Sequence, residues 1–373
     1  MDDMEFKSKV KHIISNYSKR NVIHNPDSEP DIRGLCQLLG MEQLLAPSWS
    51  KEYGGIDLGQ SANLFVLEEI VSQGLSETLY LLSVHFVGGI LNIAGTESQK
   101  NKFLPEIAKG QTFFSILYTE RTSGSDLSSL ETQAVRLDDG TFVINGEKIY
   151  SLKSQQADYA LCAVRTDSSS IGHNGITLFI VPLNDENVIL EHLDSISDEN
   201  FCRVRFNNLQ VTSEDIVGEI DQGWPLITEA ISLERTGFDY YIKAERFFKI
   251  LHESTPFFHR GTWDDHYVNA LEFELGCAKN HVNEVLSDFF ANGKVNEYQG
   301  AIAKLISSEL AVKIINYTHD NIDQSSVIIH QPQVYNKISS AYRESQGLLL
   351  SAGSSEMMLE TIARKSIYEE GVI

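Results

Sequence analysis

The sequence predicts an α+β fold in three consecutive parts, with a β part between two helical parts. Residues 1–112 place apolar residues at helical spacing, and residues 218–373 return to this pattern in longer runs. Residues 113–217 instead form short β-like apolar runs that are broken by polar turns. A chain of 373 residues is long enough for two or three packed units. We therefore expect domains over 1–112, 113–217 and 218–373.

The first helical part begins with an amphipathic run, in which apolar residues recur at helical spacing from Phe6 to Ile14. Two similar runs follow at Leu64–Val71 and Val84–Ala94. Thr96, with Gln99 three residues later, matches a capping box, in which each residue satisfies a free backbone N–H of the other. A further helix is therefore predicted to begin after Thr96.

The β part opens with a loop of small residues, Leu117–Asp126, that is rich in hydroxyl and backbone N–H groups. Such a loop can approach a flat, polar, phosphate-bearing ligand without side-chain clash. Two short alternating strands follow, joined by a turn at Asp138–Gly140. Phe201–Val211 alternates like a half-buried strand.

The last part predicts long helices over Trp224–Ile250, Val268–Ala291, Tyr298–Asp320 and Gln331–Leu350. A final helix is expected to start near Ser354 or Ser355, with Gly353 just before it. The chain has no internal repeat and no low-complexity linker.

The composition excludes several classes of protein. The net charge of -22 disfavours a nucleic-acid partner, because phosphate binding needs clustered Lys and Arg. The sequence contains no run of about 18 apolar residues, so we expect no membrane span. The first residues lack the pattern of a signal peptide. The four cysteines are far apart and lack CxxC spacing, which favours buried thiols in a reducing cytoplasm over a metal site.

The stretch Leu117–Leu152 resembles the flavin-binding segment of the acyl-CoA dehydrogenase family, which reads roughly L-T-E-P-G-A-G-S-D and N-G-x-K-x-W-I-T-N. The matching residues are Thr119, Glu120, Gly124, Ser125, Asp126, Asn145, Gly146 and Lys148. Further matches are KEYGG, LEEI, GTESQKNKFLP and VGEIDQGW, so the resemblance extends from about residue 47 to residue 364.

This resemblance implies an N-terminal helical domain, a middle β-barrel and a C-terminal four-helix bundle. It also implies that FAD lies between the β-domain and the C-terminal helices, with an acyl thioester beside the flavin. In the family, a carboxylate removes the α-proton while a hydride leaves the β-carbon for flavin N5. Such a base must be pre-positioned and partly desolvated, because an α-proton of a thioester is only weakly acidic.

The resemblance also assigns residues to the flavin. Tyr118 and Thr119 would contact the polar edge of the ring, and Ser125 the pyrophosphate. Tyr150 stands where relatives have Trp and could stack on the ring, and Leu152 lacks the hydroxyl that relatives aim at N5. A backbone amide or Ser151 could replace that hydroxyl, and simple strand packing of Tyr150 and Leu152 is the alternative. The residues that would contact the cofactor from the C-terminal part are Ser354 and Glu356.

The family places the catalytic carboxylate at one of two positions. The commoner position lies in a Y-E-G-T-S motif, which corresponds to Ser351–Ser355 here, so Ala352 stands where the base would be. The second position lies in an L-E-R motif on a helix, which Leu233–Arg235 matches. The resemblance therefore implies Glu234 as the base. A solvated helix residue is the alternative for Glu234, and Glu356 is a distant second candidate for the base.

Neighbours of Glu234 would bind the substrate. Arg235 lies beside the base on the helix, and Ser232 replaces an Asp that touches the pantetheine arm in relatives. Two cross-subunit FAD contacts of the family are altered, because Asp288–Asn292 has no Arg and Gln324–Ile329 has no Gly. We therefore expect changed FAD binding at the adenosine end, in a homodimer or homotetramer.

With these departures, the chain resembles the dehydrogenases of polyketide and nonribosomal-peptide pathways. Those enzymes oxidise short acyl groups on an acyl carrier protein, and some help to make hydroxymalonyl or aminomalonyl extender units. One alternative is a short- or branched-chain acyl-CoA dehydrogenase that feeds an electron-transfer flavoprotein. Another is a flavin-dependent oxygenase that uses oxygen. The last is a non-catalytic scaffold on the same fold.

Overall fold

The computed structural model describes residues 2–21 and 32–366, and the side chains of residues 21 and 231–234 lie outside that description. The described chain forms two compact units, one of residues 2–21, 32–195 and 199–230, the other of residues 196–198 and 231–366. The first unit thus contains both the first helical part and the sheet. The division at residues 112 and 217 stays a prediction.

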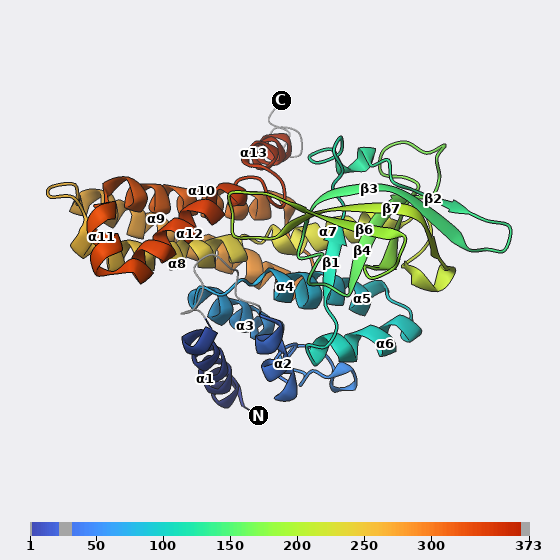
Figure 1. Cartoon of the computed structure of the whole chain (residues 1–373), viewed down its shortest axis with the longest axis horizontal. Coiled ribbons are helices and arrows are strands. Elements are labelled where there is room, and N and C mark those ends of the chain that lie inside the picture. Colours follow the sequence, from blue (N-terminus) through green and yellow to red (C-terminus); the bar gives the residue numbers. More distant parts are fainter. Residues whose placement is uncertain (1, 22–31, 367–373) are drawn as a thin grey trace. The chain divides into compact units, whose positions relative to one another are not determined.

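The first unit begins with a group of helices (Figure 1), and a π-helical segment, η2, lies between α4 and α5. Their bounds are α1 Asp3–Asn21, α2 Arg33–Met41, α3 Ser61–Ser72, α4 Thr78–Tyr80, η2 Leu81–Val87, α5 Gly88–Ala94 and α6 Glu97–Ala108. The predicted capping box is present, because Thr96 Oγ1 accepts from Gln99 N at 3.2 Å and Gln99 Oε1 accepts from Thr96 N at 3.0 Å. The Gln99 amide also donates to Ile216 O at 2.8 Å, which ties α6 to the sheet.

The predicted β-barrel takes the form of an eight-stranded sheet with the order β6-β7-β3-β2-β4-β5-β8, and β1 pairs in parallel with β4. The strands are β1 Phe114–Leu117, β2 Gln133–Arg136, β3 Phe142–Leu152, β4 Tyr159–Arg165, β5 Ile176–Pro182, β6 Val188–Leu193, β7 Phe201–Val211 and β8 Ile216–Val217. The predicted turn joins β2 and β3, and Gly140 adopts a φ of 88° there, which suits glycine. Alternate residues of β7 are buried, as the sequence predicts.

The second unit is built on a four-helix bundle of α8, α9, α10 and α12, in which α10 packs against the other three. α7 Gly223–Glu234 lies mostly in the first unit, and the helices of the second unit are α8 Phe238–Ser254, α9 Asp265–Asn292, α10 Glu297–Asn321, α11 Gln324–His330, α12 Pro332–Leu348 and α13 Ser355–Arg364. Asp264 and Asn296 cap α9 and α10 through their side chains, which satisfies the first backbone N–H groups.

The single helix predicted over Trp224–Ile250 is wrong, because α7 ends at Glu234 and α8 begins at Phe238. Gly237 separates them with a φ of 77°, and a Cβ at this position would lie 2.6 Å from the backbone of Ala303. The close approach of α10 therefore requires glycine and a break in the helix at this point.

Candidate active site

The loop after β1 carries the residues predicted to contact flavin in the first unit. It begins with a tight turn in which Glu120 N donates to Ser123 O at 3.1 Å and Ser123 N donates to Glu120 O at 3.3 Å. Gly124 and Ser125 follow at the surface, and nothing lies within 4 Å of a Cβ built on Gly124. Tyr118 and Thr119, at the start of the loop, are half-buried. The loop therefore offers a hydroxyl and open backbone to a polar ligand.

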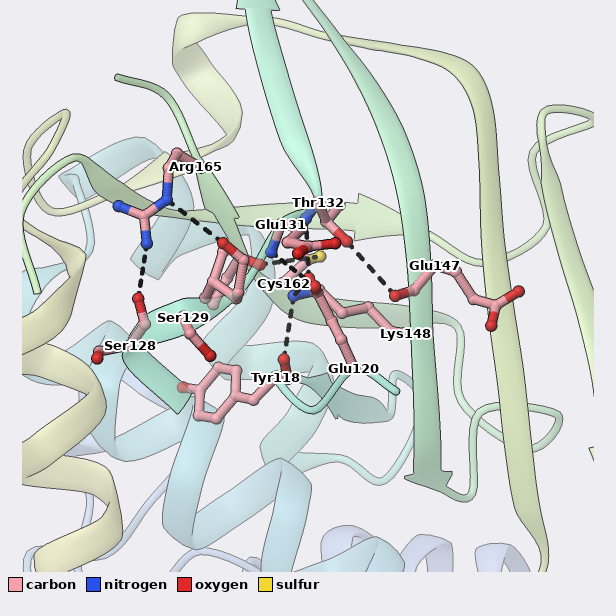
Figure 2. Close-up of polar contacts among 12 residues, drawn as sticks. Tyr118, Glu120, Ser128, Ser129, Glu131, Thr132, Glu147, Lys148, Cys162 and Arg165 are labelled. Carbon is pink, nitrogen blue, oxygen red and sulfur yellow. Dashed lines mark hydrogen bonds and ion pairs between the residues drawn. The ribbon is translucent and has the colours of Figure 1, made fainter. Parts of the chain in front are cut away.

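A buried ion pair lies beneath this loop (Figure 2). Lys148 Nζ is 2.7 Å from Glu120 Oε1 and donates to Tyr118 O at 3.0 Å. The Glu120 carboxylate accepts from Glu131 N at 2.6 Å and Thr132 N at 2.9 Å. Burial alone would raise the pKa of Glu120, but the Lys148 ammonium and these hydrogen bonds outweigh it and hold the pKa below its usual value.

Tyr150 projects from an irregularity in β3. The pairing of β3 with β7 shifts its register between Lys148 and Ser151, so the strand bulges there. Tyr150 adopts a φ of 58°, which is unfavourable for a bulky side chain, and its ring is 62% exposed. Next to it, Ile149 N donates to Thr119 O at 2.9 Å, which joins the bulge to the flavin loop. The bulge therefore presents a flat ring beside Thr119.

Ser151 points the other way, into the sheet. Its side chain is buried, and its hydroxyl lies 2.8 Å from Ser154 Oγ and donates to Cys202 O at 3.2 Å. This hydroxyl is therefore engaged inside the protein, which leaves a backbone amide as the better replacement for the hydroxyl missing at Leu152. Leu152 itself is half-buried at the end of β3.

Both predicted base positions, Glu234 and Ala352, belong to the second unit. Arg235 Nε donates to Ala352 O at 3.1 Å, so the residue after Glu234 contacts the residue at the commoner base position. Ala352 has a φ of 53°, and the next residue, Gly353, has a φ of 99°. Tyr240 fixes the same turn through its hydroxyl, which donates to Ser351 O at 3.1 Å. The side chains of Ser232 and Glu234 lie outside the described residues.

Ser354 and Glu356 lie at the start of α13. The Ser354 hydroxyl caps this helix by accepting from Met357 N at 3.4 Å, and Ser355 Oγ donates to Glu309 Oε1 at 2.6 Å. Glu356 is exposed, and a hydrogen bond from Ser354 is the main cause that lowers its pKa. A lowered pKa makes a carboxylate a weaker proton acceptor, which disfavours Glu356 as the base.

The altered adenosine-end segments are helical. Residues 288–292 end α9, and residues 324–329 lie in α11, which Asp323 caps by accepting from Ser326 N at 3.1 Å. The segment that lacks the expected glycines is therefore a short helix in this protein.

Sequence reasoning gave Glu120 and Lys148 no part in the site. Both residues match the family motif, but their contact depends on how the loop after β1 packs under β3. The available signal was one Glu and one Lys, each within a segment that matches the family motif. Charged residues are seldom buried unless paired.

Among residues 2–21 and 32–366, no group of three or more His, Cys, Asp or Glu could hold a metal ion. Over the same residues, no helix has the length and apolar character that crossing a bilayer requires.

Comparisons with known proteins place this geometry in a family. The model of the acyl-CoA dehydrogenase N-terminal domain matches residues 4–111, and that of the acyl-CoA dehydrogenase middle domain matches residues 115–209. Acyl-CoA dehydrogenase FadE29 of Mycobacterium tuberculosis is 31% identical over 238 residues, which are 63% of this chain and 61% of that protein. The match thus spans less than two thirds of the length of this curated relative.

The fold of this chain is similar to those of solved structures over nearly its whole length. The Tcur3481-Tcur3483 steroid ACAD superposes with a TM-score of 0.85 at 23% identity, covering 98% of this chain and 96% of that one. The prolyl acyl carrier protein oxidase AnaB superposes with a TM-score of 0.81 at 20% identity, covering 98% of this chain and 100% of that one. At these identities the likeness shows the fold alone. The two domain models together match more than half of the chain, which therefore belongs to the acyl-CoA dehydrogenase family, a family of FAD-binding flavoprotein oxidoreductases.

Proposed function

We propose that this protein oxidises a short acyl thioester with FAD as cofactor and Glu234 as the base. The observation that carries the proposal is the contact between Arg235 and Ala352, which brings the two possible base positions together. Since an alanine cannot accept a proton, Glu234, the residue before Arg235, is the remaining candidate for the base. It would take the α-proton of the thioester, and Arg235 and Ser232 would hold the substrate beside it.

The residues of the first unit fit a flavin. Gly124 leaves room for close approach, Ser125 offers an exposed hydroxyl to a phosphate, and Tyr150 presents an exposed ring for stacking. Tyr118 and Thr119 would bind the polar edge of the flavin, and Leu152 would border N5. From the second unit, Ser354 and Glu356 would contact the cofactor, and Ser151 would contribute through its backbone. When bound, FAD supplies the acceptor for the hydride.

We propose that the thioester is carried by an acyl carrier protein, in polyketide or nonribosomal-peptide extender-unit formation. The support is the departure of this chain from the family at Ser232, Ala352 and the adenosine end. The name of AnaB, a prolyl acyl carrier protein oxidase, indicates that this fold serves a carrier-bound substrate in at least one protein. The electron acceptor would be an electron-transfer flavoprotein or oxygen.

We also propose a cytoplasmic homodimer or homotetramer. The cytoplasmic location is supported by the four widely spaced cysteines without CxxC spacing, which suit a reducing compartment, and the homo-oligomer is supported by the family resemblance alone. Light scattering of the purified protein would give the number of subunits.

Anaerobic reduction tests the substrate. The purified flavoprotein is mixed with one short acyl group on a carrier protein and, separately, on CoA, while the visible flavin absorption is followed. Faster bleaching with the carrier-bound form is expected. Preference for CoA would instead support a short- or branched-chain acyl-CoA dehydrogenase.

Other outcomes would remove the dehydrogenase proposal. Turnover that consumes oxygen and survives Glu234→Ala would indicate an oxygenase. A colourless protein that does not take up FAD would indicate a non-catalytic scaffold.

A further inference from the structure

The flavin-contact loop is closed on itself by one carboxylate. Glu120, near its beginning, accepts hydrogen bonds from Glu131 N and Thr132 N at its end. Between these points the chain forms no strand: it makes the tight turn at Glu120–Ser123 and a 3-10 turn at Leu127–Ser129, and the Arg165 side chain donates to Ser128 O at 2.7 Å and to Leu130 O at 3.3 Å. The Glu120 carboxylate supplies the hydrogen bonds that join the two ends of the loop. Residues 118–132 therefore form a loop whose two ends are joined by a side chain.

Lys148 joins this closed loop to β3. Its ammonium is fully buried, at 0% exposure, and the Glu120 side chain is 6% exposed, so neither charge is solvated. Lys148 Nζ reaches both the Glu120 carboxylate and the carbonyl of Tyr118, while the neighbouring Ile149 N binds Thr119 O. Three successive loop residues are thus held against the strand that carries Tyr150.

A buried ion pair of this kind is costly to break. Removing one partner leaves an unpaired charge without water, which is far more unfavourable than losing an exposed pair. The nearby Cys162 thiol gives no compensation, because burial raises its pKa to about 12 and keeps it neutral. Loss of either charge should therefore destabilise the native shape of the loop.

We propose that Glu120 and Lys148 are positioning residues that form the flavin-contact segment before FAD arrives, so that binding does not have to order the loop. This inference rests on the proposed function, since it concerns the same FAD site. Neither side chain is exposed enough to touch the cofactor. Both act through the backbone of Tyr118, Thr119 and the residues up to Thr132. A pre-formed site avoids the entropic cost of ordering a loop on binding.

The experiment compares Lys148→Met with Glu147→Gln in FAD-free and FAD-bound protein. Glu147 is the preceding residue on β3 and pairs with Arg203 at 3.5 Å, both half-buried, so its variant controls for the loss of a less buried ion pair. Hydrogen exchange of the amides of 118–132 is measured without FAD, and the dissociation constant of FAD by titration. In Lys148→Met we expect faster exchange confined to these amides and about tenfold or more weaker FAD binding.

Glu147→Gln is expected to change neither quantity. Unchanged exchange and unchanged FAD affinity in Lys148→Met would overturn the inference. If Lys148→Met does not fold, Glu120→Gln and Lys148→Arg serve instead, because the first keeps the shape and the second keeps the charge. Lys148→Arg should recover FAD affinity in part, and a loss as large as that of Glu120→Gln would count against a role for the pair.

The exchange measurement also separates this inference from the proposed function. A wild-type protein that binds no FAD would refute the FAD proposal, while its loop exchange would still report whether Glu120 and Lys148 hold the segment. Conversely, a wild-type protein that binds FAD with a freely exchanging loop would refute the positioning role alone.

Discussion

The two regions that carry the predicted site differ in how they depart from the family. In the first unit, the loop after β1 and the strand β3 keep the motif residues, and a buried ion pair joins them. In the second unit, Ala352 stands where the resemblance places the usual carboxylate. Arg235, the residue after Glu234, donates a hydrogen bond to the carbonyl of Ala352. The region that would bind the cofactor is thus family-like, while the region that would act on the substrate has changed. Binding of the cofactor and oxidation of the substrate therefore need separate tests.

Glu234→Gln should give the largest effect. The amide keeps the size of the side chain but cannot accept the α-proton, and a general base contributes roughly 10²- to 10⁴-fold to a rate. We expect flavin reduction by the thioester to fall by about that factor while FAD stays bound. Stopped-flow absorption under anaerobic conditions measures both quantities.

Glu356→Gln is the matched control, because Glu356 is the other carboxylate considered for the base and its lowered pKa disfavours that role. A slow Glu356→Gln variant that keeps FAD bound, with a normal Glu234→Gln variant, would reverse the assignment of the base.

Local pattern predicted much of the fold. The capping box at Thr96 and Gln99, the turn at Gly140 and the alternation of β7 depend on residues close in sequence, and all three are present. The break at Gly237 was missed, since it arises from the approach of Ala303, which is distant in the sequence.

In the candidate site too, local sequence predicted some features, and others depend on residues far apart in the chain. Motif matching selected the flavin loop, but the contact of Lys148 with Glu120 depends on packing between segments 28 residues apart. The inward turn of the Ser151 hydroxyl likewise depends on the bulge in β3, for which the sequence gives no signal. Long-range packing, rather than local propensity, decides these features.

Glu344→Gln tests whether the second unit is held by charge in the same way as the first. Glu344 on α12 accepts from Arg246 and lies 3.3 Å from Lys243 Nζ, both on α8. Its side chain is partly buried, so losing its charge leaves two cations poorly compensated, and we expect a loss of about 2–4 kcal/mol in the free energy of unfolding. Chemical denaturation at neutral pH measures it, with Glu191→Gln, a more exposed carboxylate, as a control that loses no more than about 1 kcal/mol.

The pH dependence of this variant gives a second check. Burial would raise the pKa of Glu344, but Arg246 and Lys243 outweigh it and lower the pKa below the ordinary value of 4.5. The stabilisation is therefore present above that ordinary value and is lost as pH falls through the lower pKa of the folded protein. The difference between wild type and Glu344→Gln should shrink below about pH 4.5. A difference that grows on acidification would show that the folded-state pKa is raised instead.

A predicted site residue in each region adopts the left-handed conformation, Tyr150 with a φ of 58° and Ala352 with a φ of 53°. Glycine relieves this strain but adds disorder to the unfolded chain, so Tyr150→Gly and Ala352→Gly should each raise the free energy of unfolding by up to about 1 kcal/mol. Their effects on FAD should differ, because only Tyr150 offers a ring to the flavin. We expect several-fold weaker FAD binding for Tyr150→Gly and unchanged binding for Ala352→Gly, measured by titration of the FAD-free proteins. Equal affinities in the two variants would mean that the strain at Tyr150 serves the sheet rather than the cofactor, and the contrast between the two regions would then rest on the base alone.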